Sequence, residues 1–438
     1  MTARAARALQ GTARALQGTA RALQGTARAL QGTARALQGT ARALQGTARP
    51  RTRIWPRALL LVAGGASLAA GLDAALVLLG LPAPVGGPGT PALPGSHGAL
   101  MVFGFVGTLI ALERAVALRR RWGYAAPALL GLGALAQLAA PAWGLPQWLP
   151  RAVVLAGAVL FALVYVPLWR RQRDPAVLVQ ALGAVVAAGA AGLLAAGVAV
   201  AAVVPWLAAF VLATIAGERL ELARVRIRGR WAEPFLVVAA SALVVLCPAT
   251  LLWPAAGYPL FGAALFGLAA WLVVHDVARA TIRSTGLPRF VAACLLAGYA
   301  WLAVAAAVCL LVPGPPAGAA YDAFLHAVFL GFAMSMIMAH APVILPAVLR
   351  RPLPYHAAMW VPALLLHATL ILRVALGDAR GDMAAWQWGG AGNIVAVLAF
   401  AGVAAYSAAA HGWRKTGARG AGRTVPTRPG IPAERTGS

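Results

Sequence analysis

The chain has 438 residues, of which 61% are hydrophobic and only 11% are charged. Soluble domains carry about 45–50% apolar and about 25% charged residues, so this composition excludes a water-soluble globular protein. Long apolar runs alternate with short Arg-rich or Gly/Pro-rich breaks, which predicts an all-α, polytopic membrane helix bundle. The sequence contains no phosphate loop, dinucleotide-binding glycine motif or nucleophile elbow, and it leaves open whether the protein is an enzyme.

The formal net charge is +26, and the basic residues are almost all Arg in short connections or in the two tails. That distribution orients a membrane protein and contacts anionic headgroups, so we expect membrane lipid as a partner and no nucleic acid. The three cysteines are scattered through apolar segments and form no CxxC motif. We expect them to be small packing residues.

The N-terminal segment repeats the heptad Ala-Leu-Gln-Gly-Thr-Ala-Arg over residues 8–49. One Leu per heptad is too few for a coiled coil, and a glycine inside a helix costs up to about 1 kcal/mol relative to alanine. We therefore predict a disordered basic tail over residues 1–53, a helix bundle over 54–413 and a second disordered basic tail over 414–438.

A membrane span needs about 20 apolar residues, and about twelve segments of the chain satisfy this requirement. In chain order they are 57–80, 95–118, 123–143, 149–169, 177–199, 201–222, 234–253, 256–276, 288–312, 321–345, 355–377 and 389–411.

Arg clusters precede the first segment and follow the second, fourth, sixth, eighth and tenth, whereas the alternate connections are nearly free of Arg. The positive-inside rule then places both termini in the cytoplasm. We expect a multi-pass protein of the bacterial inner membrane.

Six of the seven histidines lie in or at the ends of these segments, where ionisable groups are costly and indicate function. They are His97, His275, His326, His340, His356 and His367. His97 opens the second segment and His326 lies near the start of the tenth, so the two should lie at similar depth. Helical spacing puts His326 and His340 on one face, and His356 and His367 on one face of the next helix.

Paired imidazoles at one depth in an apolar bundle suit an axially ligated haem, and His97 with His326 is the predicted ligand pair. His367 and His340 are further candidate metal ligands, with copper as the second metal. Met334 and Met338, four residues apart, would add soft sulfur ligands. The alternatives are that each histidine bonds to a neighbouring helix and that the methionines only pack.

Three more residues are candidates for a supporting shell or a proton path: Asp73, Arg373 and His356. Asp73 lies well inside the first segment, where it would either orient a ligand histidine or pair with Arg373. Glu113–Arg114 and Glu218–Arg219 close the second and sixth segments, and we expect salt bridges from them to neighbouring helices.

Two stretches resemble the NnrS family, membrane proteins of about twelve helices that contain haem and copper and are linked to nitric oxide stress. One is His97-Gly-Ala-Leu-Met-Val-Phe-Gly-Phe. The other begins at His326-Ala-Val-Phe-Leu-Gly-Phe and runs through Arg350-Arg351-Pro352-Leu353 to Leu372-Arg373-Val374. The chain departs from the family at Gly98, where an acidic residue is usual, and it lacks a Gly-His-Thr-Gly turn after the tenth segment.

The leading hypothesis is therefore a haem-binding, copper-binding membrane protein that responds to a small diatomic ligand, nitric oxide or oxygen, or that transfers electrons. The alternative is a cofactor-free, proton-coupled transporter that uses the buried histidines and Asp73. Broken helices near the membrane midplane would favour the alternative.

Overall fold

The computed structural model divides the chain into two units, Met1–Ile54 and Trp55–Ser438. It describes residues 55–86, 93–224, 227, 229–349 and 353–421, all of which belong to the second unit. The tail predicted over residues 1–53 lies outside these ranges. Eleven helices of the described part are long and apolar enough to cross a membrane, which confirms the all-α polytopic bundle.

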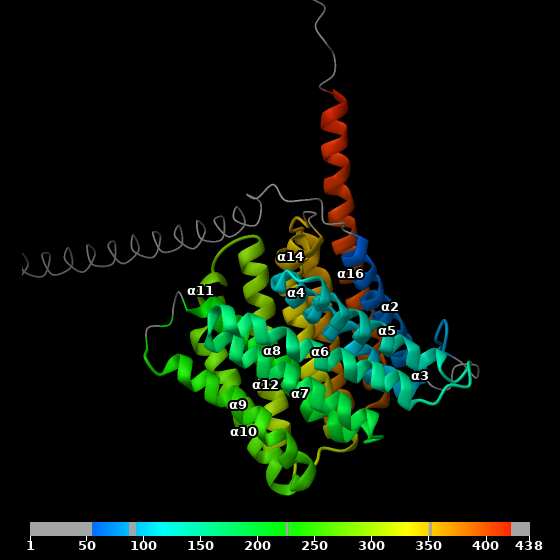
Figure 1. Ribbon diagram of the computed structural model, residues 1–438, viewed down its shortest axis with the longest axis vertical. Coiled ribbons are helices and arrows are strands. Elements are labelled where there is room, and N and C mark those ends of the chain that lie inside the picture. Colours follow the sequence, from blue (N-terminus) through cyan, green and yellow to red (C-terminus); the bar gives the residue numbers. More distant parts are fainter. Residues whose placement is uncertain (1–54, 87–92, 225–226, 228, 350–352, 422–438) are drawn as a thin grey trace, which may run out of the picture. The chain divides into compact units, whose positions relative to one another are not determined.

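The second unit consists of consecutive helices joined by short connections (Figure 1). In chain order they are α2 (Trp55–Leu78), α3 (Leu93–Ala99), η1 (Leu100–Gly107), α4 (Thr108–Leu118), η2 (Arg121–Tyr124), α5 (Ala125–Ala139), α6 (Trp148–Gln172), α7 (Pro175–Ala195), α8 (Val200–Ala223), α9 (Ala232–Leu252), α10 (Pro254–His275), α11 (Ala278–Thr281), α12 (Leu287–Leu311), α13 (Gly318–His326), η3 (Ala327–Met334), α14 (Ser335–Leu349), η4 (Ala357–Met359), α15 (Trp360–Ile371), η5 (Leu372–Asp378) and α16 (Met383–Ala421).

Three long helices each consist of an α-helical part followed directly by a π-helical part. They are α3–η1–α4, α13–η3–α14 and α15–η5. The first two correspond to the predicted second and tenth segments, and the third to the eleventh. Each π-helical part spans seven or eight residues, whereas most known π-helices are single-turn bulges that are frequent at functional sites.

The third predicted segment, 123–143, forms the shorter helix α5, which has 15 residues. At 1.5 Å per residue it is about 22 Å long, less than the roughly 30 Å of a bilayer core. Pro141 and Gly144 interrupt the apolar run after it. The helix still crosses the bundle. Arg171, at the end of α6, donates to Leu118 O at the end of α4 (2.9 Å), so these two helix ends lie at the same face. The chain between them therefore crosses to the opposite face in α5 and returns in α6.

Hydrogen bonds at the two ends of the bundle agree with this alternation. We call the helix ends beside Arg119, Arg171, Arg224 and Arg279 the Arg-rich face. There Arg57, at the start of α2, donates to Tyr124 Oη (3.0 Å). On the opposite face Gln387, at the start of α16, donates to Leu79 O at the end of α2 (3.1 Å). These bonds place the start of α2 beside Tyr124 at one face, and the end of α2 beside the start of α16 at the other.

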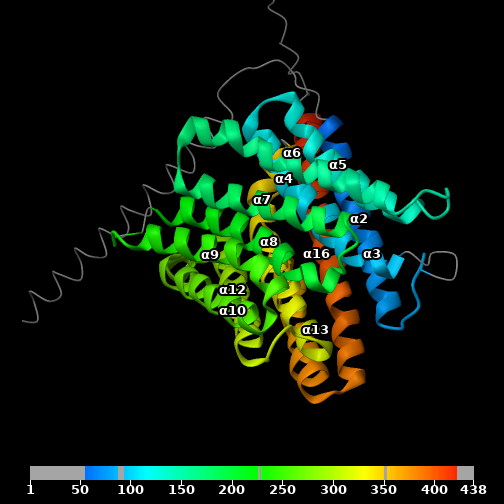
Figure 2. The same ribbon diagram turned by 60° about the horizontal axis from the view of Figure 1, so that its bottom comes forward.

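Helices α7, α8 and α9 lie side by side, and α8 is the most deeply buried of the long helices (Figure 2). Small residues permit this packing. A side-chain carbon added at Gly183 of α7 would lie 2.9 Å from Phe210 O of α8, and one added at Gly217 would lie 2.6 Å from Ala176 O. Glycine at these two positions thus sets the close approach of the α7 and α8 backbones.

Helix α16 continues to Ala421, so residues 414–421 are helical although they were predicted to belong to a disordered tail. The helix can continue there because the first proline beyond the span is Pro426. Residues 422–438 of that tail lie outside the described ranges.

Candidate functional site

His97 lies in α3, at the opposite face of the bundle from the Arg-rich face, and its Nδ1 lies 2.8 Å from Gly71 O of α2. A carbonyl oxygen only accepts hydrogen bonds, so Nδ1 carries the proton and Nε2 keeps its lone pair. No hydrogen bond to that Nε2 is recorded from the described residues. Metal-binding histidines usually have this arrangement, with one ring N–H donated to a carbonyl and the other nitrogen free.

His326 ends α13 and has the same tautomer. Its Nδ1 lies 2.9 Å from Asp322 O and 3.2 Å from the Asp322 carboxylate, one helical turn earlier. The Nε2 of His326 likewise has no recorded partner among the described residues. Its side chain is 15% exposed, so the imidazole lies close beneath the surface of the bundle.

His326 and Arg373 both lie within electrostatic range of His97. The sequence predicted the pair from its similar depth in two different helices. What the structure adds is that both rings keep an Nε2 lone pair free of protein hydrogen bonds.

Asp322 is the centre of the polar network beside this pair, and the sequence analysis missed it. Its carboxylate receives two hydrogen bonds from Arg373, each 2.8 Å, and one from Trp386 Nε1 at 3.2 Å. The Arg373 guanidinium also lies over the Trp386 ring, 4.9 Å from its centroid. The sequence signal was available, because Asp322 precedes His326 by four residues, the spacing of neighbours on a helix.

Glycines of α16 let this network form. A side-chain carbon on Gly389 would lie 2.7 Å from both the backbone nitrogen and Cβ of Arg373. The α16 backbone therefore packs directly on the π-helical turn that carries Arg373, which is only 6% exposed. A buried guanidinium needs such a fixed partner, and Asp322 supplies it.

The π-helical parts mark the same region. The segment η1 begins three residues after His97, η3 begins directly after His326, and η5 contains Arg373. The sequence analysis did not predict them. The only shared sequence signal is a Phe- and Gly-containing stretch after each of the two histidines.

The ring lone pairs of two further predicted ligands, His367 and His340, are occupied. His367 Nδ1 accepts a hydrogen bond from Trp301 Nε1 (3.1 Å), so its Nε2 carries the proton. The Trp301 ring packs against Gly331 of η3, where a side-chain carbon would lie 2.3 Å away. His340 donates from Nδ1 to Met336 O and accepts from Arg219 at Nε2. Neither ring offers a free lone pair in this arrangement.

The remaining predicted residues are dispersed. Asp73 accepts from Val85 N (3.2 Å), while Arg373 is held by Asp322. His356 caps the short helix η4 by accepting from Ala358 N (3.1 Å) and is exposed at the Arg-rich face. Met334 and Met338 are buried in the core.

A second polar network lies toward the Arg-rich face, as the acidic–basic pairs in the sequence suggested. Arg114 pairs with Glu113 (2.6 Å) and with Glu218 of α8 (3.2 Å), and it donates to Gln180 Oε1 (3.0 Å). A separate set links Arg219 to Asp276 at 3.9 Å. Tyr299 donates to the same Asp276 carboxylate (2.9 Å).

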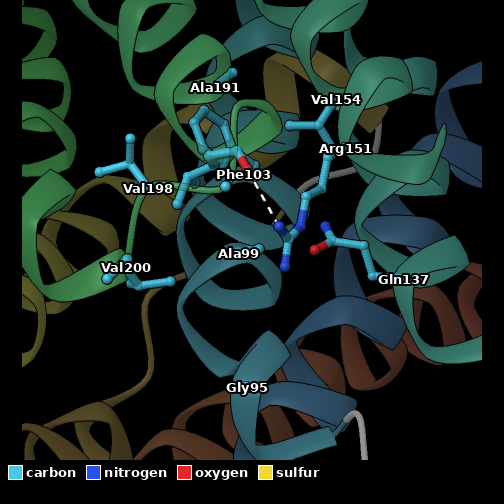
Figure 3. Close-up of a pocket in the computed structure, with 12 residues that line it drawn as sticks. Gly95, Ala99, Phe103, Gln137, Arg151, Val154, Ala191, Val198 and Val200 are labelled. Carbon is cyan, nitrogen blue, oxygen red and sulfur yellow. Dashed lines mark hydrogen bonds between the residues drawn. The ribbon is translucent and has the colours of Figure 1, made fainter. Parts of the chain in front are cut away.

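A cavity of about 200 Å³ lies beside α3, between it and helices α5, α6, α7 and α8 (Figure 3). Arg151 and Gln137 point toward each other in its wall, and Arg151 donates to Leu194 O (3.3 Å). Gly95 and Ala99 line the cavity, so His97, two residues from each, lies on the other side of the helix. The cavity is therefore separate from the histidine pair.

Among the described residues, no three His, Cys, Asp or Glu side chains are close enough together to hold a metal ion. His97 and His326 each present an Nε2 without a protein partner in the described part of the chain, and His275 at the Arg-rich face has the same arrangement, with its Nδ1 3.2 Å from Trp271 O. A comparison with protein-family models covers the whole bundle. A family model described as "Domain of unknown function (DUF8744)" matches residues 57–409.

The chain belongs to the DUF8744 family. The match begins at the first residues of the membrane bundle and ends in α16, so the family domain and the bundle coincide. No curated protein and no solved structure matches the chain significantly.

Proposed function

We propose that this DUF8744 protein is a membrane metalloprotein in which His97 and His326 bind a transition metal. The observation that carries the proposal is their shared tautomer. Each ring donates Nδ1–H to a carbonyl oxygen, at 2.8 and 2.9 Å, and each leaves Nε2 free in an apolar bundle. Imidazole nitrogens held in this way are ligands for iron and copper.

The donor set fits two forms of the centre. His97 and His326 would hold either the iron of a haem or a single copper ion through their imidazole nitrogens. Neither His97 nor His326 lines the cavity beside α3, so a copper ion needs less rearrangement of the helices than a porphyrin. In both the haem and the copper form, two imidazoles bind the metal. Metal analysis distinguishes iron from copper.

The chain's own residues would position these ligands. The Asp322 carboxylate, 3.2 Å from His326 Nδ1, makes that imidazole a stronger donor, and Arg373 holds the carboxylate in place. A bound iron or copper would supply a site for a small diatomic ligand such as nitric oxide or oxygen, or a one-electron centre. The resemblance of the His97 and His326 stretches to the NnrS family supports this role. We further infer that the Arg-rich face and both termini are cytoplasmic, in a bacterial inner membrane.

The test uses the full chain purified from cells supplied with iron, a haem precursor and copper. We expect near-stoichiometric copper, or haem with its visible absorption band, by metal analysis and spectroscopy. The double variant His97→Ala, His326→Ala should lose the metal. His356→Ala removes an exposed histidine at the Arg-rich face and is the matched control. Wild-type protein without metal, or a double variant that keeps it, would overturn the proposal.

A proton-coupled transporter is the second candidate, and one observation favours it. Asp73 is buried in α2, and its Oδ2 has no hydrogen-bond partner within the part of the chain that the structure describes. An ionisable side chain inside a membrane span is costly and therefore indicates a function such as transport. Proton-driven uptake by proteoliposomes that is lost in Asp73→Asn, in a metal-free preparation, would decide for transport.

A further inference from the structure

A second cavity lies in the half of the bundle nearer the Arg-rich face, remote from the histidine pair. It has a volume of about 490 Å³, within the range of about 300–1,000 Å³ that is typical of small-molecule sites. Its walls come from α2, η1, α4, α8, η3, α14 and α16. It therefore lies where seven helical segments converge, and its occupant would touch all of them.

The wall is apolar almost throughout. Leu68 of α2, Phe105 of η1 and Phe400 of α16 are representative of the side chains that line it. Beyond Phe400, the α16 side is formed by small residues, namely Ala401, Ala404, Ala405 and Ala408. An apolar body would fill this space, as is usual for ligand cavities with few polar groups.

The polar groups in the wall are few. They are the carboxylates of Glu113 and Glu218, the Thr214 hydroxyl and the His340 ring. The hydroxyl already donates to Phe210 O (2.9 Å), and the ring nitrogens are both bonded to protein. What remains to meet a ligand is the negative charge of the two carboxylates.

The two carboxyl groups of this wall outnumber the cationic side chains that pair with them. Glu113 and Glu218 share a single guanidinium, that of Arg114, which lies behind them and does not line the cavity. The next cation, Arg219, has its own acidic partner in Asp276. When both carboxyls are ionised, these groups sum to one negative charge beside an apolar space, where the low dielectric strengthens the attraction to a cation.

We propose that this cavity binds a lipophilic cation, a molecule with an apolar body and one positive charge such as a protonated hydrophobic amine. The body occupies the space between α2, α14 and α16, and the charge lies against Glu218 and Glu113. This assignment does not depend on the metal centre, because the two sites share no residue.

The test uses the full chain in nanodiscs of zwitterionic phosphatidylcholine and measures binding of tetraphenylphosphonium by equilibrium dialysis, with empty nanodiscs as background. Tetraphenylborate has the same shape and the opposite charge. We expect saturable binding of one tetraphenylphosphonium per chain and no competition by tetraphenylborate. Binding no greater than in empty nanodiscs, as expected if a lipid chain fills the cavity, would overturn the proposal.

Two variants make the test specific. Glu218→Gln removes the excess charge and leaves Arg114 paired with Glu113, so no buried cation is left without a partner; we expect at least tenfold weaker binding. Ala404→Phe fills the cavity without changing its charge and should also abolish binding. Ala409→Phe, on the same helix but outside the cavity wall, is the control. Wild-type affinity in both Glu218→Gln and Ala404→Phe contradicts the assignment.

Discussion

Arg373 and Asp322 form a two-point ion pair, with both nitrogen–oxygen distances at 2.8 Å, between the π-helical end of one span and the start of another. The arginine is 6% exposed and the side chain of the aspartate 19%. The pair joins η5 to α13 and holds the carboxylate that contacts His326. It therefore links the stability of this end of the bundle to the geometry of the proposed metal ligand.

Replacing only one residue of this ion pair should strongly destabilise the folded protein. Asp322→Asn and Arg373→Met each leave a buried charge without its partner, and we expect each to lower the free energy of unfolding by about 3–5 kcal/mol. The double variant should lose clearly less than the sum. Unfolding of the purified protein in detergent measures all three, with Trp386→Phe as a control that loses one hydrogen bond of about 1 kcal/mol. Strictly additive losses would show that the two side chains are not coupled.

The ring tautomers predict which histidines matter for metal binding. His340 and His367 have their nitrogens occupied by Arg219 and Trp301, so His340→Gln and His367→Gln should keep the metal content of the wild type. His97→Gln and His326→Gln should each reduce it at least tenfold. Metal analysis of the four single variants makes the comparison. Loss of metal in His367→Gln would instead support the wider ligand set that the sequence suggested.

Two glycines of α16 should respond in opposite directions to alanine. Gly389→Ala places a carbon 2.7 Å from the Arg373 backbone, and we expect a loss of about 1–3 kcal/mol from overpacking. Gly402→Ala meets no atom within 4 Å and should gain about 0.5–1 kcal/mol of helix stability. Thermal unfolding of both variants against the wild type checks the signs. Equal effects would mean that the contact of α16 with η5 is not tight.

An ion pair outside the spans predicts a response to acid. Hydrogen bonds from the Arg224 guanidinium, and also from Ala176 N–H, hold the pKa of Asp174 below its usual value of 3.8, against the opposing effect of partial burial. A carboxyl with a lowered pKa stabilises the fold above its ordinary pKa, and this contribution is lost as the pH falls below about 4.

Asp174→Asn keeps the helix cap of α7 but loses the charge, so its unfolding temperature should fall less steeply than that of the wild type between pH 5 and pH 3. Asp382→Asn is the control, because Asp382 also caps a helix, through Ala385 N–H. If Asp174→Asn and the wild type show the same acid dependence, Arg224 does not stabilise the ionised carboxylate.

The orientation can be tested with single cysteines, because all three native cysteines are buried. Thr285→Cys lies in an Arg-rich connection and Ala142→Cys in a connection at the opposite face, and both positions are exposed. A membrane-impermeant maleimide should label Ala142→Cys in spheroplasts and Thr285→Cys only after permeabilisation. The reverse pattern would place the Arg-rich face outside.

The sequence by itself determined the helical class, the approximate bounds of the segments and their alternation between two faces. These features depend on local properties: the length of each apolar run and the position of Arg between the runs. It also singled out His97 and His326, because a histidine is unusual in such a run wherever the rest of the chain lies. The shortness of α5 and the helical continuation to Ala421 escaped it, since helix ends depend on contacts as well as composition.

Only the tertiary structure decided which nitrogen lone pairs of three histidines are free and which are occupied. That depends on partners distant in the sequence: Gly71 for His97, Trp301 for His367 and Arg219 for His340. The same holds for Asp322, which becomes the centre of a network because Arg373 and Trp386 fold back onto it. A pattern along one chain records which polar groups are buried, but the hydrogen bonds that give them a role form between helices.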